Sequence, residues 1–400
     1  MPNTPGRFVL SFGRSFSPTA GASMFILYRY LLRQFLQIFL ICFCSMDGLY
    51  IVIDAFTNLE EFISYGERHG GVFAVIGKYY VYRSLSFFDA TSGIVALIAA
   101  MFTLAMFQRF NELTALLAAG ISQRRIIKPI VYAALVISLL AAASRELVIP
   151  RVRDKLALDS HDLGGERAKE LRPKRDDSTD ILLRGKQTVA KARQIIEPNF
   201  MLPQSLDAPY KQLQAADAYY LPADAKHPSG YLMTGLTQPK DLAKRPSLLD
   251  KNGKPLVLSP HDYHWLKEDQ CFVPSDITFE QLVGADDWLR YASFLELVAG
   301  LRNRSLALGA DVAVAIHARP LQPLLDMTLL FLGLPLMLQR GKNVFAAIGM
   351  CVGLVVAFLM LVMGAQYLGS SYWISPSLAA WLPLMVFVPL AIAMSDPLRE

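Results

Sequence analysis

Six long apolar stretches, arranged as two groups of three, constrain the fold of this chain more than any other feature. They cover residues 34–53, 84–107, 126–144, 312–338, 344–368 and 378–394. A helix needs roughly 20 mostly apolar residues to cross the hydrocarbon core of a bilayer, and each stretch is about that long. The 53% hydrophobic content also exceeds the roughly 45–50% of soluble domains. The sequence therefore predicts an α-helical transmembrane bundle of six helices, three before and three after a long insertion.

The insertion, residues 151–305, has a different character. Its first part, 151–180, is rich in charged residues and is interpreted as an exposed connector that begins as a helix. Short apolar runs separated by Pro, Gly, Asp and Asn follow, at 181–183, 188–196, 214–221, 231–236, 256–258 and 270–273. Such punctuated runs favour an antiparallel β sandwich or roll. The sequence thus predicts an inserted, extracytoplasmic all-β domain.

A helical stripe closes the insertion. Apolar residues recur at helical spacing from Trp288 to Leu301, so we expect one helix there, either near the membrane surface or packed on the β domain. The domains expected from the sequence are a disordered cytoplasmic tail at 1–23, helices 1–3 in 24–150, the β domain with its connector at 151–305, and helices 4–6 in 306–400.

The distribution of basic residues predicts the orientation. One side of the bundle would carry Arg7, Arg14, Arg29, Arg33, Arg109, Arg124, Arg125, Lys128, Arg340 and Lys342. The short loops on the other side carry only Arg68, Lys78 and Arg83. Because short cytoplasmic loops are enriched in Lys and Arg, both termini are expected in the cytoplasm.

Sequence motifs give no indication of catalysis on this chain. There is no phosphate-binding P-loop, no His-Glu-x-x-His zinc motif and no Gly-x-Ser-x-Gly nucleophile motif. The six histidines are scattered, and Cys271 is the only cysteine of the insertion, so no internal disulfide is expected there. We therefore expect no cofactor or metal and no nucleic-acid partner, and any energy would come from another polypeptide.

The segment 109–122 between the second and third stretches is a candidate site of partner binding. Its apolar residues recur at Phe110, Leu113, Leu116 or Leu117, and Gly120, which predicts one apolar face on a helix of about three turns. Gly120 suits the left-handed residue that ends a helix, and Ser122 is placed to cap the next one. Glu112 lies in the first turn, where a carboxylate is favoured. Two interpretations stay open: a docking element for a cytoplasmic partner, or a helix lying on the bilayer surface.

Several acidic residues fall inside the apolar stretches. Asp47 and Asp54 are seven residues apart and share a helix face, Asp89 begins the second stretch, and Asp326 lies in the middle of the fourth. A charge in the bilayer is costly, so such groups normally face a bundle interior or a cavity. Both a cavity lining and a hydrogen-bonded structural role are compatible with the sequence.

Several short motifs together resemble one protein family. They are Tyr28–Arg33 (YRYLLR), Tyr79–Arg83 (YYVYR), Asn111–Ser122 (NELTALLAAGIS), His317–Pro323 (HARPLQP) and Ala380–Pro383 (AWLP). With the arrangement of three spans, a domain and three spans, they resemble the LptF/LptG (YjgP/YjgQ) permeases, which extract lipopolysaccharide from the bacterial inner membrane. The resemblance covers essentially the whole chain after residue 23.

The resemblance implies a partner set. A cytoplasmic ABC ATPase would bind ATP and Mg²⁺, a paralogous permease subunit would complete a heterodimer, and a periplasmic bridge protein would receive the lipid from a β-jellyroll, beside a single-span accessory subunit. The segment 109–122 would dock into the ATPase through Arg109, Phe110, Asn111, Glu112, Leu113, Thr114, Leu116, Leu117 and Gly120. Glu112 would occupy the family's coupling position.

The resemblance also implies a lipid cavity with a lateral gate between the first and fifth spans. The candidate cavity or gate residues are Asp47, Leu49, Tyr50, Asp54 and Asp326. Some family members carry basic residues at the outer end of the first span, where this chain has Asp47, Asp54, Glu60 and Glu61. Acidic groups repel phosphate, so this subunit is expected to contribute less to head-group binding, or the lipid differs.

The leading hypothesis is thus a non-catalytic permease subunit of an ATP-driven exporter of lipopolysaccharide or a related glycolipid. The first alternative is a mechanotransmission subunit of an ABC-type complex that does not itself carry lipid. A sensor or scaffold with a ligand-binding β domain is a third interpretation, and a membrane enzyme is the least favoured.

Overall fold

The structure is a computed structural model that describes residues 19–68, 71–157, 162–164, 167–203, 210–224, 227–250, 253–303, 305, 309–338 and 344–395. Within these residues, six helices are long and apolar enough to cross a membrane. They are α1 (Thr19–Thr57), α3 (Val72–Arg109), α5 (Gln123–Ala143) with its continuation, α10 (Ala310–Leu338), α11 (Val344–Ser370) and α12 (Pro376–Met394). The six predicted spans are confirmed. Helix α1 already begins at Thr19, inside the predicted tail, whose residues 1–18 lie outside the described part.

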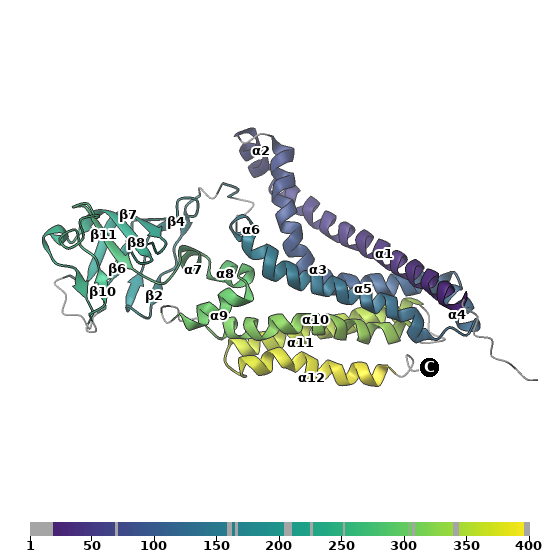
Figure 1. Cartoon of the computed structure of the whole chain (residues 1–400). Helices are drawn as coiled ribbons and strands as arrows, with labels where there is room; N and C mark the ends of the chain where they lie inside the picture. Colours follow the sequence, from purple (N-terminus) through teal and green to yellow (C-terminus); the bar gives the residue numbers. More distant parts are fainter. Residues whose placement is uncertain are drawn as a thin grey trace, which may run out of the picture.

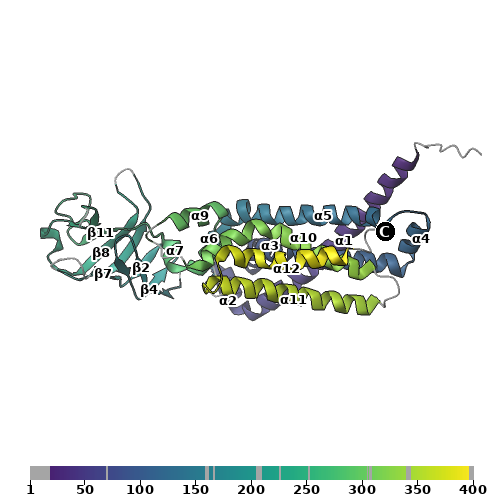
Figure 2. The same ribbon diagram turned by 90° about the horizontal axis from the view of Figure 1, so that it is seen from below.

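The helices form an elongated bundle with the β domain at one end (Figure 1). Helix α1 packs on α3 and α5, whereas α11 packs mainly on α10 and α12. The start of α1 and the C-terminal end both lie at the end of the bundle remote from the β domain, beside the short helix α4 (Glu112–Ala118) (Figure 2).

Helix α3 begins twelve residues before the predicted second span, which corrects that boundary. A short amphipathic helix, α2 (Leu59–Arg68), precedes it and buries Phe62. The Phe62 ring lies 5.4 Å from the ring of Tyr79 and 5.9 Å from that of Tyr80. These aromatic contacts pack α2 against the N-terminal half of α3.

Small residues allow α3 and α10 to approach closely. A Cβ atom added to Gly93 would lie 2.3 Å from the Oδ1 atom of Asp326, and one added to Gly333 would lie 2.4 Å from the Cδ1 atom of Leu97. Transmembrane helices associate largely through such close packing, because lipid offers no hydrophobic driving force between them. The α3–α10 contact is therefore the centre of the bundle.

The third span extends well beyond the predicted stretch. After α5 the helix continues through a π-helical turn, η1 (Ser144–Val148), and then α6 (Ile149–Leu156). The apolar span and its continuation cover 34 residues, Gln123–Leu156. The charged connector thus begins as a helix, as predicted, and this helix carries the third span to the β domain.

The β domain is one curled antiparallel sheet with a small second sheet. Its strands are β1 (Lys169–Glu170), β2 (Lys174–Asp176), β3 (Ile181–Leu183), β4 (Gln187–Val189), β5 (Gln194–Ile196), β6 (Asn199–Met201), β7 (Gln212–Leu221), β8 (Gly230–Gln238) and β11 (Gln270–Pro274). Their order is β1-β4-β5-β7-β6-β3-β2, with β8 on the other edge of β7 and β11 on β8. Strands β9 (Leu248–Leu249) and β10 (Pro255–Val257) form the small sheet, and a short 3₁₀ helix, η2 (Leu242–Lys244), precedes them.

The inner face of the curled sheet holds a core of its own. Phe200, Tyr231 and Met233 are fully buried there, and the Tyr231 hydroxyl donates to the carbonyl of Ile277 at 3.0 Å. Burial raises the pKa of Tyr231 well above its ordinary value. Cys271, also fully buried, is a free thiol, so the core is not cross-linked through it.

Two details of the predicted domain were wrong. The run 188–196 is a hairpin, because the segment 190–193, which contains the charged residues Lys191 and Arg193, forms the turn between β4 and β5. The single helix expected from Trp288 to Leu301 is two helices, α8 (Ala285–Tyr291) and α9 (Phe294–Arg302), after a short α7 (Phe279–Val283). Ser293 begins α9 with a capping box to Glu296, a signal present in the sequence.

Candidate functional site

The connection between α3 and α5 is a tight turn that contains the two-turn helix α4. Asn111 adopts a left-handed conformation, with φ of 58°, and separates α3 from α4. At the other end, the Ile121 amide donates to the Leu116 carbonyl at 3.1 Å and the Gly120 amide to that of Leu117 at 3.0 Å. With Gly120 at φ of 79°, this is a Schellman motif, which confirms the predicted role of Gly120.

The helix is shorter than the predicted three turns, because Asn111 turns the chain. Leu113 is buried in the bundle core, and Leu116 and Leu117 pack partly against it, so the leucines form the expected apolar face. Phe110 precedes the turn and is 61% exposed, which corrects its placement on that face. Ser122 occupies the cap position of α5, but its hydroxyl makes no capping hydrogen bond.

The surface around α4 is polar, basic and centred on one aromatic ring. Phe110 is exposed, as are Asn111 and Thr114. The exposed basic residues near them are Arg109, Arg124, Arg125 and Lys128. An exposed aromatic side chain with a polar rim is the usual anchor of a protein interface. This arrangement suits the docking of a soluble protein better than contact with acyl chains.

Glu112 connects α4 to the first span. The Tyr30 hydroxyl of α1 donates to the Glu112 carboxylate, at 3.2 Å from Oε2 and 3.4 Å from Oε1. The Tyr30 ring also packs edge-on against Phe107 of α3, with ring centroids 5.8 Å apart. Sequence reasoning missed Tyr30 as a partner of Glu112, although it lies in the YRYLLR motif. This hydrogen bond therefore joins α4 directly to α1.

The acidic residues of α1 face α3. Ser84 donates to the Oδ2 atom of Asp47 at 2.7 Å, and Tyr80 donates to the Oδ2 atom of Asp54 at 2.7 Å. Asn58 adds a third hydrogen bond, at 3.3 Å, to Asp54. Both carboxylates are thus hydrogen-bonded within the chain, although the Oδ1 atom of Asp47 is buried without a hydrogen-bond partner among the described residues. Their assignment to the cavity or gate stays a prediction.

The remaining candidates of the cavity lie on different surfaces. Tyr50 stacks on Phe87 of α3 at 5.6 Å, whereas Leu49 is 62% exposed on the outward face of α1. Asp326 lies between three helices, where it accepts hydrogen bonds from Ser138 of α5 at 2.5 Å and from Gln322 at 3.3 Å. The structure thus brings Tyr50 to the α1–α3 contact with Asp47 and Asp54, and places Asp326 in the separate α3–α5–α10 core.

A polar network missed by sequence reasoning joins the bundle to the β domain. Arg145, in the π-helical turn, forms an ion pair with Asp89 of α3 at 2.8 Å. Its neighbour Glu146 lies 3.6 Å from Arg319 of α10 and accepts the amide of Phe294 at 2.7 Å. π-Helical turns often occur at functional sites, and this one holds three spans and the start of α9 together.

Arg319 completes this network. Its guanidinium donates to the carbonyls of Ala292, at 2.5 Å, and Leu289, at 2.9 Å. These two carbonyls lie at the end of α8, where the chain breaks before α9. The network therefore fixes the angle at which α8 and α9 leave the membrane-spanning helices.

His261 and His264 lie close together in the sequence, in the loop before β11. No group of three or more potential metal ligands occurs among the described residues. His261 instead lies 2.7 Å from the Oδ1 atom of Asp262, and the Ser247 amide donates to Oδ2 at 2.6 Å. These hydrogen bonds lower the pKa of Asp262 to about 2.

Comparison with known families agrees with this geometry. Residues 29–175 and 218–396 match the family model of the lipopolysaccharide export system permease LptF/LptG. The chain belongs to the LptF/LptG family. The resemblance inferred from the short motifs is thereby confirmed, as is the transmembrane bundle with an inserted β domain. No curated protein matches the chain. The residues outside the LptF/LptG match include 176–217, which contain the β4–β5 hairpin.

Membership in the LptF/LptG family identifies the chain as a multi-pass membrane permease subunit of the lipopolysaccharide export type. The α4 surface is the best candidate for a site of partner binding, because the same short helix has a polar exposed face and is hydrogen-bonded to α1 through Glu112.

Proposed function

We propose that this chain is a non-catalytic permease subunit of an ATP-driven exporter that extracts lipopolysaccharide, or a related glycolipid, from the bacterial inner membrane. A separate ABC ATPase would bind ATP and Mg²⁺ and dock on α4 from the cytoplasm, where both termini would lie. A paralogous permease would complete the transport pathway, and a periplasmic bridge protein would take the lipid from the β domain.

The observation that carries this proposal is the direct hydrogen bond from Tyr30 to Glu112. The exposed surface around Phe110 gives the ATPase a place to bind, and the bond transfers its movement to α1 without an intermediate element. Because Leu113 is anchored in the core, a pull on α4 also reaches α3 and α5. The chain thus couples a soluble docking surface to several membrane helices.

The exposed margins of the bundle support a lipid pathway. Only 11% of the apolar window of α1 and 17% of that of α11 is buried within the chain. Large apolar side chains such as Leu40 and Leu49 on α1, and Met360 and Met363 on α11, face outward. Such surfaces, paired with those of a paralogous subunit, suit acyl chains, since each methylene removed from water is worth roughly 0.8 kcal/mol.

The decisive variant is Glu112→Arg in the assembled exporter. An arginine at this position cannot accept the hydrogen bond from Tyr30, and it changes the charge that α4 presents to the ATPase. We therefore expect the amount of lipid exported per ATP hydrolysed to fall roughly tenfold, which corresponds to about 1.4 kcal/mol. The measurement is the transfer of lipopolysaccharide from proteoliposomes to the bridge protein, together with phosphate release. Glu67→Arg, the same charge change on exposed α2, is the matched control. Unchanged export by Glu112→Arg, with the complex intact, would overturn the proposal.

Lipid carriage is tested separately from coupling. A photoreactive residue at Leu49 should form an ATP-dependent adduct with lipopolysaccharide, and one at Val386 on α12 should form less. Both positions are exposed and apolar in this chain. An active ATPase without any adduct at Leu49 would favour the mechanotransmission subunit, which uses the same link from α4 to α1.

A further inference from the structure

The turn between α11 and α12, residues 371–375, lies at the end of the bundle that faces the β domain (Figure 1). It presents aromatic side chains to the outside, because Trp373 is 81% exposed and Tyr372 is 71% exposed. Tyr367, in the last turn of α11, is 73% exposed. Residues 367–373 thus carry three aromatic rings that the chain itself leaves largely uncovered.

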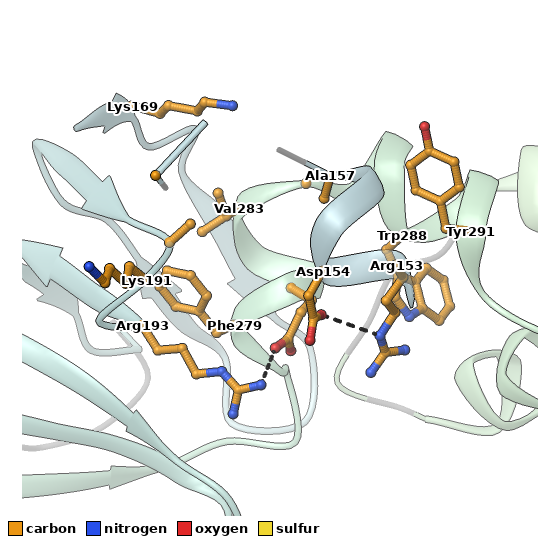
Figure 3. Close-up of a pocket in the computed structure, with 14 residues that line it drawn as sticks. Arg153, Asp154, Ala157, Lys169, Lys191, Arg193, Phe279, Val283, Trp288 and Tyr291 are labelled. Carbon is orange, nitrogen blue, oxygen red and sulfur yellow. Dashed lines mark ion pairs between the residues drawn. The ribbon is translucent and has the colours of Figure 1, made fainter. Parts of the chain in front are cut away.

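Two aromatic residues of α8, also near the β domain, show the opposite arrangement. Trp288 and Tyr291 line a cavity of about 420 Å³ at the junction of the bundle with the β domain (Figure 3). Both are buried, and Trp288 packs with Leu297 of α9 and Val312 of α10. The rings of α8 therefore have a role in packing within the chain, whereas those of the α11–α12 turn can contact only the surroundings.

The hairpin of α11 and α12 has no charged residue that could fix its depth in a bilayer. The sequence contains no Asp, Glu, Lys, Arg or His from Val344 to Met394. Most of the apolar window of α11 is also exposed, so packing within the chain restrains this span weakly. The tilt of a span is set by packing on its neighbours and by interfacial Trp, Tyr, Lys and Arg residues. At the end near the β domain, α11 has only the aromatic members of this set.

The length of α12 places the turn at the surface of the bilayer. The 19 residues of Pro376–Met394 extend about 29 Å at 1.5 Å per residue, close to the roughly 30 Å of the hydrocarbon core. Because α12 is just long enough to cross this core, the residues directly before Pro376 fall in the head-group region. Trp and Tyr are enriched at that level, since each combines an apolar ring with one polar group.

Hydrogen bonds give the turn a defined shape. The Trp373 amide donates to the Leu368 carbonyl at 3.0 Å, and the Tyr372 amide donates to the Gly369 carbonyl at 3.2 Å. Tyr372 has a φ of 59°, a left-handed conformation that is unfavourable for a bulky residue. A bulky side chain kept in such a conformation points to a role for that side chain.

Gly369 fixes the turn to two neighbouring spans. A Cβ atom added to Gly369 would lie 2.5 Å from the Cβ atom of Ala379 in α12 and 2.8 Å from the Cγ2 atom of Val314 in α10. The backbone of the turn therefore packs directly on both helices. Any contact that holds the aromatic rings in place also restrains α10, α11 and α12.

We infer that Tyr367, Tyr372 and Trp373 form an interfacial anchor, which inserts into the head-group region of the bilayer on the side of the β domain. The partner is a phospholipid surface, recognised through amphipathic rings and not through charge, so a zwitterionic lipid is sufficient. The anchor holds the second half of the bundle at a fixed depth. It does not depend on the transport proposal and would remain if that proposal failed.

The test measures the depth of Trp373 by fluorescence quenching. The full chain is reconstituted in phosphatidylcholine vesicles whose lipids carry bromine either at the start or at the middle of the acyl chains. The difference between the unmodified chain and Trp373→Phe isolates the signal of Trp373 from that of the other three tryptophans. We expect the shallow bromine to quench this signal roughly twofold more than the deeper one.

Trp381 of α12 is the matched control for depth, because it is also exposed. It lies five residues after Pro376, about 8 Å deeper in the bilayer. Its signal, isolated in the same way with Trp381→Phe, should be quenched more by the deeper bromine.

A second measurement tests whether the ring holds the hairpin in place. Trp373→Leu keeps the position apolar but removes the indole N–H group, and Trp381 then reports the depth of α12. In vesicles of longer acyl chains, we expect Trp381 to lie deeper in this variant than in the unmodified chain. Trp265→Leu, at an exposed position of the β domain, should leave the depth of Trp381 unchanged.

Three results overturn the inference. The first is equal quenching of Trp373 by the two bromine positions. The second is the absence of quenching by either, which would mean that the turn faces water or a protein instead of lipid. The third is the same depth of Trp381 with and without Trp373→Leu in the thicker bilayer.

Discussion

Helices α1 and α3 are equally apolar but lie in different surroundings. Both reach a mean hydropathy of 2.0 over their best windows, yet 11% of the α1 window is buried and 56% of that of α3. The buried positions of α3 include Ser92, Ala96, Ala99 and Ala100, whereas α1 exposes leucines and isoleucines. Hydropathy therefore shows that a helix can cross the membrane, and side-chain size shows which helix packs at the centre.

The second half of the bundle repeats this contrast in a stronger form. Helix α11 has the highest mean hydropathy of the six spans, 2.7, and is 17% buried; α10 has the lowest, 1.6, and is 67% buried. Two of the polar residues that lower the hydropathy of α10 bind neighbouring segments: Arg319 donates to carbonyls of α8 and the following residue, and Asp326 accepts from Ser138 of α5. Gln322 donates to Asp326 within α10. Polar groups in a span thus mark the interior of the bundle.

The largest difference between buried α3 and exposed α1 is expected when one glycine of each helix is replaced by alanine. Gly93→Ala puts a Cβ atom 2.3 Å from the carboxylate of Asp326, which Ser138 also holds, whereas a Cβ atom at Gly48 of α1 meets nothing within 4 Å. We expect Gly93→Ala to destabilise the bundle by about 2–3 kcal/mol, as overpacking does. Gly48→Ala should be neutral or slightly stabilising, since Ala favours helix. Unfolding in mixed micelles measures both, and equal effects would contradict the contrast.

Shortening one leucine in each helix, in two separate variants, should change the free energy of unfolding by a smaller amount. Leu97 of α3 is 1% exposed and packs on Gly333, whereas Leu40 of α1 is 57% exposed. Leu97→Ala should cost about 1–2 kcal/mol, less than in a soluble core because the alternative surroundings are hydrocarbon. Leu40→Ala should change the unfolding free energy by less than about 0.5 kcal/mol. A larger cost at Leu40 would mean that α1 packs within this chain.

Removing one hydroxyl tests whether Asp326 holds the centre together. Ser138→Ala deletes the bond from α5 to Asp326, and we expect a loss of about 0.5–1.5 kcal/mol, the range of hydrogen bonds between membrane helices. Ser370→Ala is the control, because its hydroxyl bonds only the Gln366 carbonyl of its own helix, at 2.9 Å. Equal unfolding free energies for the two variants would show that the bond between helices carries no stability.

The smallest effect on stability is expected at the link to α1. Tyr30→Phe keeps the ring against Phe107 but removes the exposed hydrogen bond to Glu112, so the unfolding free energy should change by less than about 0.5 kcal/mol. Export per ATP hydrolysed should nevertheless fall, because α4 then moves without α1. Tyr132→Phe, an exposed tyrosine on α5, is the control. A variant with normal coupling would show that α1 is driven by another contact.

The sequence was sufficient for features that depend on local chemistry. The six spans follow from length and apolarity, and Gly120 follows from the left-handed residue that a helix end needs. The hairpin in 188–196 and the break at Ser293 also had local signals that were overlooked. These signals were the charged residues Lys191 and Arg193 in the turn of the hairpin and the capping box at Ser293. The confirmed resemblance to the family added the order of the domains.

Contacts between distant segments could not be predicted, because they depend on how the helices pack. Tyr30 and Glu112 are 82 residues apart, and Asp89 and Arg145 are 56 apart. No local pattern selects these partners among the other polar residues of the spans. The assignment of Phe110 to the same apolar helix face as the leucines was wrong for a related reason, since one left-handed residue, Asn111, redirects the chain.

The continuous helix from Gln123 through the π-helical turn to Leu156 gives the molecule a lever arm. At 1.5 Å per residue its 34 residues have a length of about 51 Å along the helix, from the turn after α4 to the start of the β domain. A tilt of about 5° at one end would swing the other by about 4 Å, more than the length of a hydrogen bond. Pro129 near its start and the π-helical turn are irregular points of this helix, so the rigidity of these two places sets how much of the movement reaches the β domain.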